Sequence, residues 1–334
     1  MRIESSNIQK SVEIRASKGI YEKSGINFTK PLAMTKKESK YIMSLLEKYA
    51  PDTENKKLRL EVLNVLDRKL IFFFGNSLSD IGYFYQEMMK KVLLEIEEYK
   101  VKKGLVIWQT YGHGFIVKCP EIIFGFDIIS GIDKICISSS LRNSICQNLE
   151  TLFVSHVHYD HMDINIIKKM ISLGKTVFLS SDIYESLSRF KNCYELPVAI
   201  KESIATLNES IEVKFFAGHQ NPYCSNTSYY IKTRDGISIL HMGDQNDPNE
   251  ILSWVKKLAP VDVLLFNATS TSMIEIIDEI KPRNLILGHL YEYGHPLRGF
   301  SLIPGCYKEA IKLFAKHKPI IMTWGECLRI LPSH

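Results

Sequence analysis

The stretch VSHVHYDHMD, residues 154–163, constrains this chain more than any other part of its sequence. Three histidines and two aspartates fall within residues 156–163, directly after the apolar run 152–154. The whole chain of 334 residues has only ten histidines, so this clustering carries information. Imidazole and carboxylate groups together hold borderline cations such as zinc. The motif therefore predicts a metal site where a strand ends and the chain turns.

The spacing within the motif indicates two cations rather than one. His156 and His158 are two residues apart, so an extended backbone aims both side chains the same way. Asp160 and His161 follow as the chain turns, and Asp163 lies where the N-cap of a following helix belongs. One cation cannot readily use all four side chains with this local geometry, but two cations can if further ligands come from elsewhere.

Further candidate ligands follow three later apolar runs. His219 ends VKFFAGH, Asp244 ends ISILHMGD and His289 ends NLILGH, each close to a glycine. Glycine lets the backbone approach a crowded site. Strand ends that face one edge of a sandwich are a common place for a site. We therefore expect these three side chains to join the motif in space.

The composition is that of an ordinary globular protein, with 45% hydrophobic and 24% charged residues. No apolar run reaches membrane-spanning length, and the N-terminus lacks the apolar segment of a secretion signal. The seven cysteines contain no CxxC pair, so we expect a reducing, cytoplasmic location and no cysteine-only zinc site.

The positive charge is concentrated near the N-terminus. Residues 1–103 hold 20 Lys and Arg against 14 Asp and Glu. We interpret this excess as a solvated helical surface. The alternative is an arm that meets nucleic acid or anionic lipid, but the charges do not cluster enough to favour such a partner.

Hydrophobic periodicity divides the chain into two regions. Residues 1–35 are poorly patterned, and from about residue 37 apolar residues recur at helical spacing in three segments. From residue 104, short β-rich runs alternate with helical ones, and Asp235-Gly236 marks a hairpin turn. We predict an N-terminal helical extension over 1–103. Over 104–334 we predict an α/β domain with two mixed sheets and helices outside.

The motifs HVHYDH, GH, GD and GH, in that order, resemble the metallo-β-lactamase superfamily. The resemblance covers about residues 104–334 and implies an αββα sandwich. The run QTYGHGFIVKCPEIIFGFDII is similar to the opening hairpin of the branch that contains ascorbate-6-phosphate lactonase. In that branch an aspartate closes the second strand, and Asp127 matches it.

The resemblance also implies how the side chains divide between two divalent metal ions. The implied ligands of one cation are His156, His158 and His219. Those of the other are Asp160, His161 and His289, with Asp244 bridging the two. Zinc is the first expectation, and the same ligands accept manganese or iron.

A centre of this kind implies a hydrolase that acts on a small molecule. The two cations lower the pKa of a shared water and polarise a P=O or C=O group. Asp160 is then expected to orient the nucleophile, and His295 is the candidate proton donor to the leaving group. Asp127 is expected to hold the free N–H of a histidine ligand, the alternative being a strand-end turn residue. The expected bond is an ester, lactone or phosphodiester, in a phosphorylated substrate by preference.

Loops beside the expected ligands supply candidate substrate contacts, each weighed against an ordinary solvated residue. These candidates are His113, Asn221, Tyr223 and Tyr291. His241 is interpreted as a packed strand histidine, and NATSTS, residues 267–272, as a helix-capping segment. Cys224 is not assigned a nucleophilic role, because the activated water already fills it.

Two alternatives stay open. One is an iron-dependent oxygenase of the same fold, although the second ligand is histidine where the diiron flavoprotein branch has glutamate. The other is a partner-binding protein whose N-terminal helices carry the main role, for example in a homo-oligomer. The aromatic runs 72–74 and 83–85 could supply that contact, but we expect them to pack as core.

Overall fold

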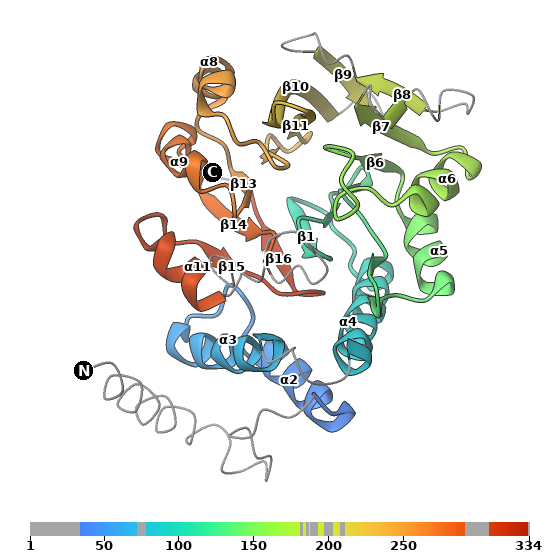
Figure 1. The fold of residues 1–334 in the computed structure, drawn as a ribbon, viewed down its shortest axis with the longest axis vertical. Helices are drawn as coiled ribbons and strands as arrows, with labels where there is room; N and C mark the ends of the chain where they lie inside the picture. Colours follow the sequence, from blue (N-terminus) through green and yellow to red (C-terminus); the bar gives the residue numbers. More distant parts are fainter. Residues whose placement is uncertain are drawn as a thin grey trace.

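The computed structural model describes residues 34–71, 78–180, 183–184, 187, 193–196, 203–207, 211–290 and 307–332. Two seven-stranded sheets face each other, and helices cover both outer sides (Figure 1). This four-layer arrangement confirms the αββα sandwich expected from the sequence. Within the described ranges, no helix combines the length and apolar character that crossing a bilayer requires.

The strands of the two sheets alternate with helices along much of the chain. The first sheet contains β1 (Leu105–Gln109), β2 (Phe115–Lys118), β3 (Ile123–Phe126), β6 (Thr151–Phe153), β7 (Thr176–Ser180), β8 (Cys193–Leu196) and β16 (Cys327–Ile330). The second contains β9 (Ser203–Leu207), β10 (Ile211–Asn221), β11 (Cys224–Lys232), β12 (Ser238–His241), β13 (Val263–Asn267), β14 (Asn284–Gly288) and β15 (Ile320–Ile321). Their orders are β16-β1-β2-β3-β6-β7-β8 and β15-β14-β13-β12-β11-β10-β9. A separate two-stranded sheet joins β4 (Gly131–Ile132) to β5 (Ile135–Cys136).

Helices cover the outer face of each sheet (Figure 1). On the side of the first sheet lie α4 (Leu78–Glu98), α5 (Ser139–Asn148) and α6 (Ile164–Ser172). On the side of the second lie α8 (Pro248–Leu258), α9 (Ile274–Ile280) and α11 (Tyr307–Leu313). The short 3-10 turns are η1 (Thr271–Met273) and η2 (Ala315–His317).

Side-chain alternation along the strands places one apolar core between the sheets and another under the helices. In β1, Ile107 belongs to the core that both sheets share, and the next residue, Trp108, belongs to the core that includes the helices. Phe153 of β6 meets Tyr229 of β11 across the gap, with ring centroids 5.0 Å apart. The hairpin predicted at Asp235-Gly236 is present, since β11 and β12 pair antiparallel on either side of it.

Among the described residues before 104, the structure has the three helices that were predicted. They are α2 (Lys36–Lys48), α3 (Lys56–Ile71) and α4. Thr35 begins α2 with a capping box, because its side chain accepts from the Glu38 backbone and the Glu38 carboxylate accepts from Thr35 N. Phe84 and Tyr85 are buried, as expected of core residues, whereas residues 72–74 lie outside the described residues.

These helices share one apolar core with the sandwich and are joined to it by buried polar contacts. Arg59 of α3 forms a buried ion pair with Glu326, next to β16. Asp67 of the same helix accepts hydrogen bonds from the backbone N–H groups of Tyr307 and Lys308, at the start of α11. The helices therefore pack on the sandwich, and the boundary at residue 103 stays a prediction.

We expect Glu326→Ala to lower the free energy of unfolding by about 3–5 kcal/mol, because it leaves the Arg59 guanidinium buried without its partner. Lys316→Ala removes an exposed ion pair with Asp278 and should change that free energy by no more than about 0.5 kcal/mol. Urea denaturation of both variants measures the difference. Equal midpoints for the two variants would contradict the prediction.

Candidate metal centre

The histidine motif forms a tight loop between β6 and α6. The backbone N–H groups of His161 and Met162 both donate to the carbonyl of His158, which turns the chain. Asp163 caps α6, as predicted, by accepting from the backbone of Asn165 and Ile166. The turn brings His156, His158 and His161 together, with ring centroids 4.8 Å and 4.1 Å from His156.

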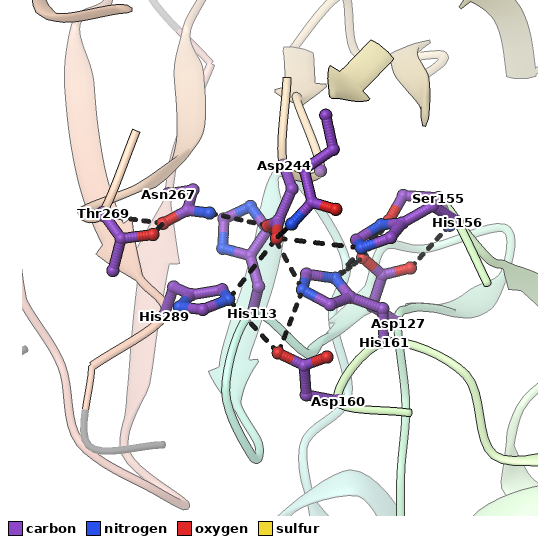
Figure 2. A network of polar contacts seen from close by, with 12 residues as sticks. His113, Asp127, Ser155, His156, Asp160, His161, Asp244, Asn267, Thr269 and His289 are labelled. Atoms are coloured by element: carbon purple, nitrogen blue, oxygen red, sulfur yellow. Dashed lines mark hydrogen bonds and ion pairs between the residues drawn. The ribbon is translucent and has the colours of Figure 1, made fainter. Parts of the chain in front are cut away.

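Ligand atoms from distant parts of the chain meet this loop in three groups, within each of which they lie within 4.8 Å of one another. The groups are Asp160, His161 and His289; His156, His161 and Asp244; and His156, His158 and Cys224. Figure 2 shows that His289, Asp160, His161 and Asp244 point toward a common centre. Six of the seven side chains expected from the sequence thus lie together.

The second sheet delivers two of these side chains because its central strands are parallel. Strands β12, β13 and β14 pair in parallel, so their carboxyl ends meet at one edge. Asp244 follows β12 and His289 follows β14. His289 has a left-handed backbone (φ 60°), and so does the glycine before Asp244 (φ 57°). A Cβ on that glycine would lie 2.3 Å from Asn226 Oδ1, so the close approach requires glycine.

Asp127 follows the last strand of the β2–β3 hairpin, and its carboxylate contacts the loop that carries the histidine motif. Its carboxylate accepts from Ser155 N at 2.7 Å and Ser155 Oγ at 2.6 Å, and it lies 2.8 Å from His161 Nδ1. Burial raises the pKa of Asp127, but the His161 ring, with His241 and His156, holds it below the ordinary value. With Nδ1 engaged in this way, Nε2 of His161 faces the centre.

Asp244 is held by side chains that were not expected from the sequence to orient a metal ligand. Asn267 Nδ2 donates to Oδ1 at 2.6 Å, and Gln220 Nε2 donates to Oδ2 at 2.9 Å. The Asp244 backbone N–H donates to Asn226 Oδ1. The sequence feature that could have identified Asn267 is its position at the end of an apolar run, VDVLLFN. In the structure this run is a strand parallel to those that end near Asp244 and His289.

The helix-capping interpretation of residues 267–272 is wrong. Asn267 Oδ1 accepts from the backbone N–H and the hydroxyl of Thr269, while its amide reaches Asp244. Neither η1 nor α9 has a side-chain cap. The segment therefore orients a carboxylate of the site (Figure 2).

His219 does not join the three groups. Its backbone N–H donates to Glu250 Oε2 at 2.9 Å, its ring Nδ1 lies 2.7 Å from Glu250 Oε1, and its side chain is 44% exposed. The register of β10 and β11 shifts between His219 and Asn221, close to the turn. Beside His156 and His158, the structure places the Cys224 sulfur instead.

The substrate-side candidates divide into three cases. Asn221 and Tyr223 lie exposed on the β10–β11 turn. Tyr291 and the candidate proton donor His295 lie outside the described residues. His113 was a candidate substrate contact in a loop, but its ring is fully buried, 4.3 Å from the His241 ring. His241 in turn stacks on Phe126 within the strands, as predicted.

The buried carboxylates of the centre attract positive charge. Burial lowers the pKa of His161, but Asp244, Asp160 and Asp127 together raise it well above the ordinary value. Burial, followed by His161, lowers the pKa of His156 to about 3. Nε2 of His156 is buried and has no hydrogen-bond partner among the described residues. The buried carboxylates attract positive charge, and together with the neutral imidazole of His156 they form a donor set that suits a divalent cation.

Residues 139–298 match the model of the β-lactamase superfamily domain. The chain has the metallo-β-lactamase fold. This fold implies divalent metal ions, which the observed donor set fits. No curated protein matches the sequence.

Three solved structures illustrate the likeness, which at their sequence identities concerns the fold alone. Igni18, a metallo hydrolase from Ignicoccus hospitalis KIN4/I, has 16% identity and a TM-score of 0.52, over 68% of this chain and 98% of its own. Isothiocyanate hydrolase from Delia radicum gut bacteria has 11% identity and a TM-score of 0.53, over 68% and 100%. CmlA, a diiron β-hydroxylase from Streptomyces venezuelae, has 12% identity and a TM-score of 0.52, over 69% and 55%.

We expect Asp127→Asn to lower the affinity for a divalent cation by about 10–100-fold, because the amide no longer fixes the proton on His161 Nδ1. Competition with a chelating dye measures this affinity. Asp133→Asn is the matched control, since Asp133 is exposed and has a similar left-handed backbone (φ 52° against 46°). Unchanged affinity in Asp127→Asn would contradict the role given to its carboxylate.

Proposed function

We propose that this chain is a metal-dependent hydrolase that activates water between two divalent cations, zinc by preference. The observation that carries the proposal is the convergence of Asp160, His161 and His289 on one side and His156 and Asp244 on the other. Asp244 is suited to bridge, since one of its oxygens lies 3.2 Å from His161 Nε2 and the other lies 3.7 Å from His156 Nε2. Both distances leave room for a cation between the donors.

The substrate is proposed to be a small molecule with an ester, lactone or phosphodiester bond. The resemblance of the β2–β3 hairpin to the branch with ascorbate-6-phosphate lactonase favours a phosphorylated one. When bound, the cations lower the pKa of a water and polarise the oxygen of the scissile group. Either zinc or manganese would supply this chemistry.

The protein side chains then orient and move protons. Asp160 is buried, and its Oδ2 lies 3.4 Å from His289 Nε2, which suits it to orient the attacking water. Asp127 keeps His161 in the tautomer whose Nε2 faces the centre. His295 is the proposed donor of the proton to the leaving group. Tyr291, Asn221 and Tyr223 are the proposed substrate contacts.

A screen with bis-p-nitrophenyl phosphate, a lactone and a thioester, each with and without chelator, tests the reaction class. We expect turnover of at least one substrate, lost on chelation and restored by zinc. Activity that survives thorough removal of metal would contradict the proposed mechanism.

His158→Ala should abolish turnover and leave the fold intact, because His158 is a partly exposed loop residue whose ring meets the centre. Initial rates and far-UV circular dichroism give the two readouts. His317→Ala, in η2 and outside every ligand group, is the control and should keep the rate. Near-normal turnover in His158→Ala would remove it from the ligand set.

An iron-dependent oxygenase is the second candidate, favoured by the fold that the chain shares with the diiron β-hydroxylase CmlA. Metal analysis of protein purified without added metal separates the two. Iron with visible absorbance would support the oxygenase, and zinc would support the hydrolase.

A role for the N-terminal helices in a homo-oligomer is also proposed as an alternative. The burial of Phe84 and Tyr85 limits the apolar surface that these helices could offer. Light scattering after size exclusion gives the mass, and a monomer would remove this alternative.

A further inference from the structure

Cys224 occupies a position that the metallo-β-lactamase resemblance does not give to a cysteine. It is the first residue of β11, and its side chain is buried. Its sulfur forms a group with one ring nitrogen each of His156 and His158, in which the ligand atoms lie within 4.8 Å of one another. A thiol and two imidazoles at this separation can face a single cation.

A second observation concerns a ring nitrogen of His156, which belongs to this group and also lies 3.7 Å from Asp244 Oδ2 through Nε2. His156 is fully buried, and its Nδ1 lies 3.0 Å from Ser155 Oγ. The other ring nitrogen, Nε2, has no hydrogen-bond partner among the described residues. A buried imidazole nitrogen left in this state costs free energy unless a ligand engages it.

The residue expected to complete this group has another partner. His219 is bound through both its backbone N–H and its ring to the carboxylate of Glu250 in α8. Its side chain is 44% exposed, whereas Cys224 is buried. The buried position beside His156 and His158 therefore belongs to sulfur rather than to imidazole.

We propose that Cys224 is a protein ligand of the cation held by His156 and His158, in the place that the resemblance gives to His219. The inference rests on the proposed metal centre. On binding, the S–H bond breaks, the proton leaves to water, and the thiolate bonds to the metal. A soft thiolate selects zinc or iron over manganese and adds one negative charge to this side of the centre.

Cobalt(II) substitution tests the proposal without any measurement of activity. We expect the cobalt protein to show a sulfur-to-cobalt charge-transfer band in the near ultraviolet. The band should be lost in Cys224→Ser and kept in His219→Ala. Cys146→Ser, another buried cysteine that belongs to none of the ligand groups, is the matched control and should keep the band.

X-ray absorption at the zinc edge of the wild-type protein covers the case in which Cys224→Ser does not fold. We expect sulfur scattering at about 2.3 Å from zinc. Bound cobalt or zinc with only nitrogen and oxygen neighbours would overturn the proposal, and so would a band that persists in Cys224→Ser. Protein that binds no divalent cation would instead overturn the proposed function, so the two failures are distinguishable.

Discussion

The buried carboxylate of Asp127 is the interaction on which the arrangement of the site depends. It lies at the end of β3, whose parallel neighbour β6 leads into the histidine motif. A carboxylate in a fully buried position is costly unless donors and positive charge surround it. Ser155 and His161 supply them, and in doing so they fix the path of the loop that carries the remaining motif residues.

The two sheets are joined at this same edge by backbone and side-chain hydrogen bonds. Thr227 N donates to the carbonyl of Ser155, and the Tyr229 hydroxyl donates to the carbonyl of Val154. His289 N donates to the carbonyl of Gly112 in the turn before β2. These contacts explain how ligands from separate sheets keep their spacing, because the motif loop and the backbone at His289 are each hydrogen-bonded to the opposite sheet or its turn.

The N-terminal helices are also part of the packing of the sandwich. They cover apolar residues of the first sheet and of the chain's C-terminal part, and the ion pair of Arg59 with Glu326 lies buried in that contact. Removing one partner of a buried ion pair destabilises the fold, because the other charge is left buried without compensation. The helices therefore support the sandwich, whatever further role they have.

The sequence by itself determined the features that depend on neighbouring residues. It determined the motif turn capped by Asp163, the alternation of strands and helices, the hairpin at Asp235-Gly236, and the strand ends that carry Asp244 and His289. Only the tertiary structure decided whether each of the other site candidates points toward the metal centre or away from it. A shift of register near His219 and the distant partner Glu250 turn that histidine away, and the same hairpin brings Cys224 inward. Neighbouring strands likewise bury His113 and direct Asn267 to Asp244. The direction of these side chains depends on contacts between residues far apart in the chain. A shift of one residue in strand register moves every side chain of that strand to the opposite face of the sheet.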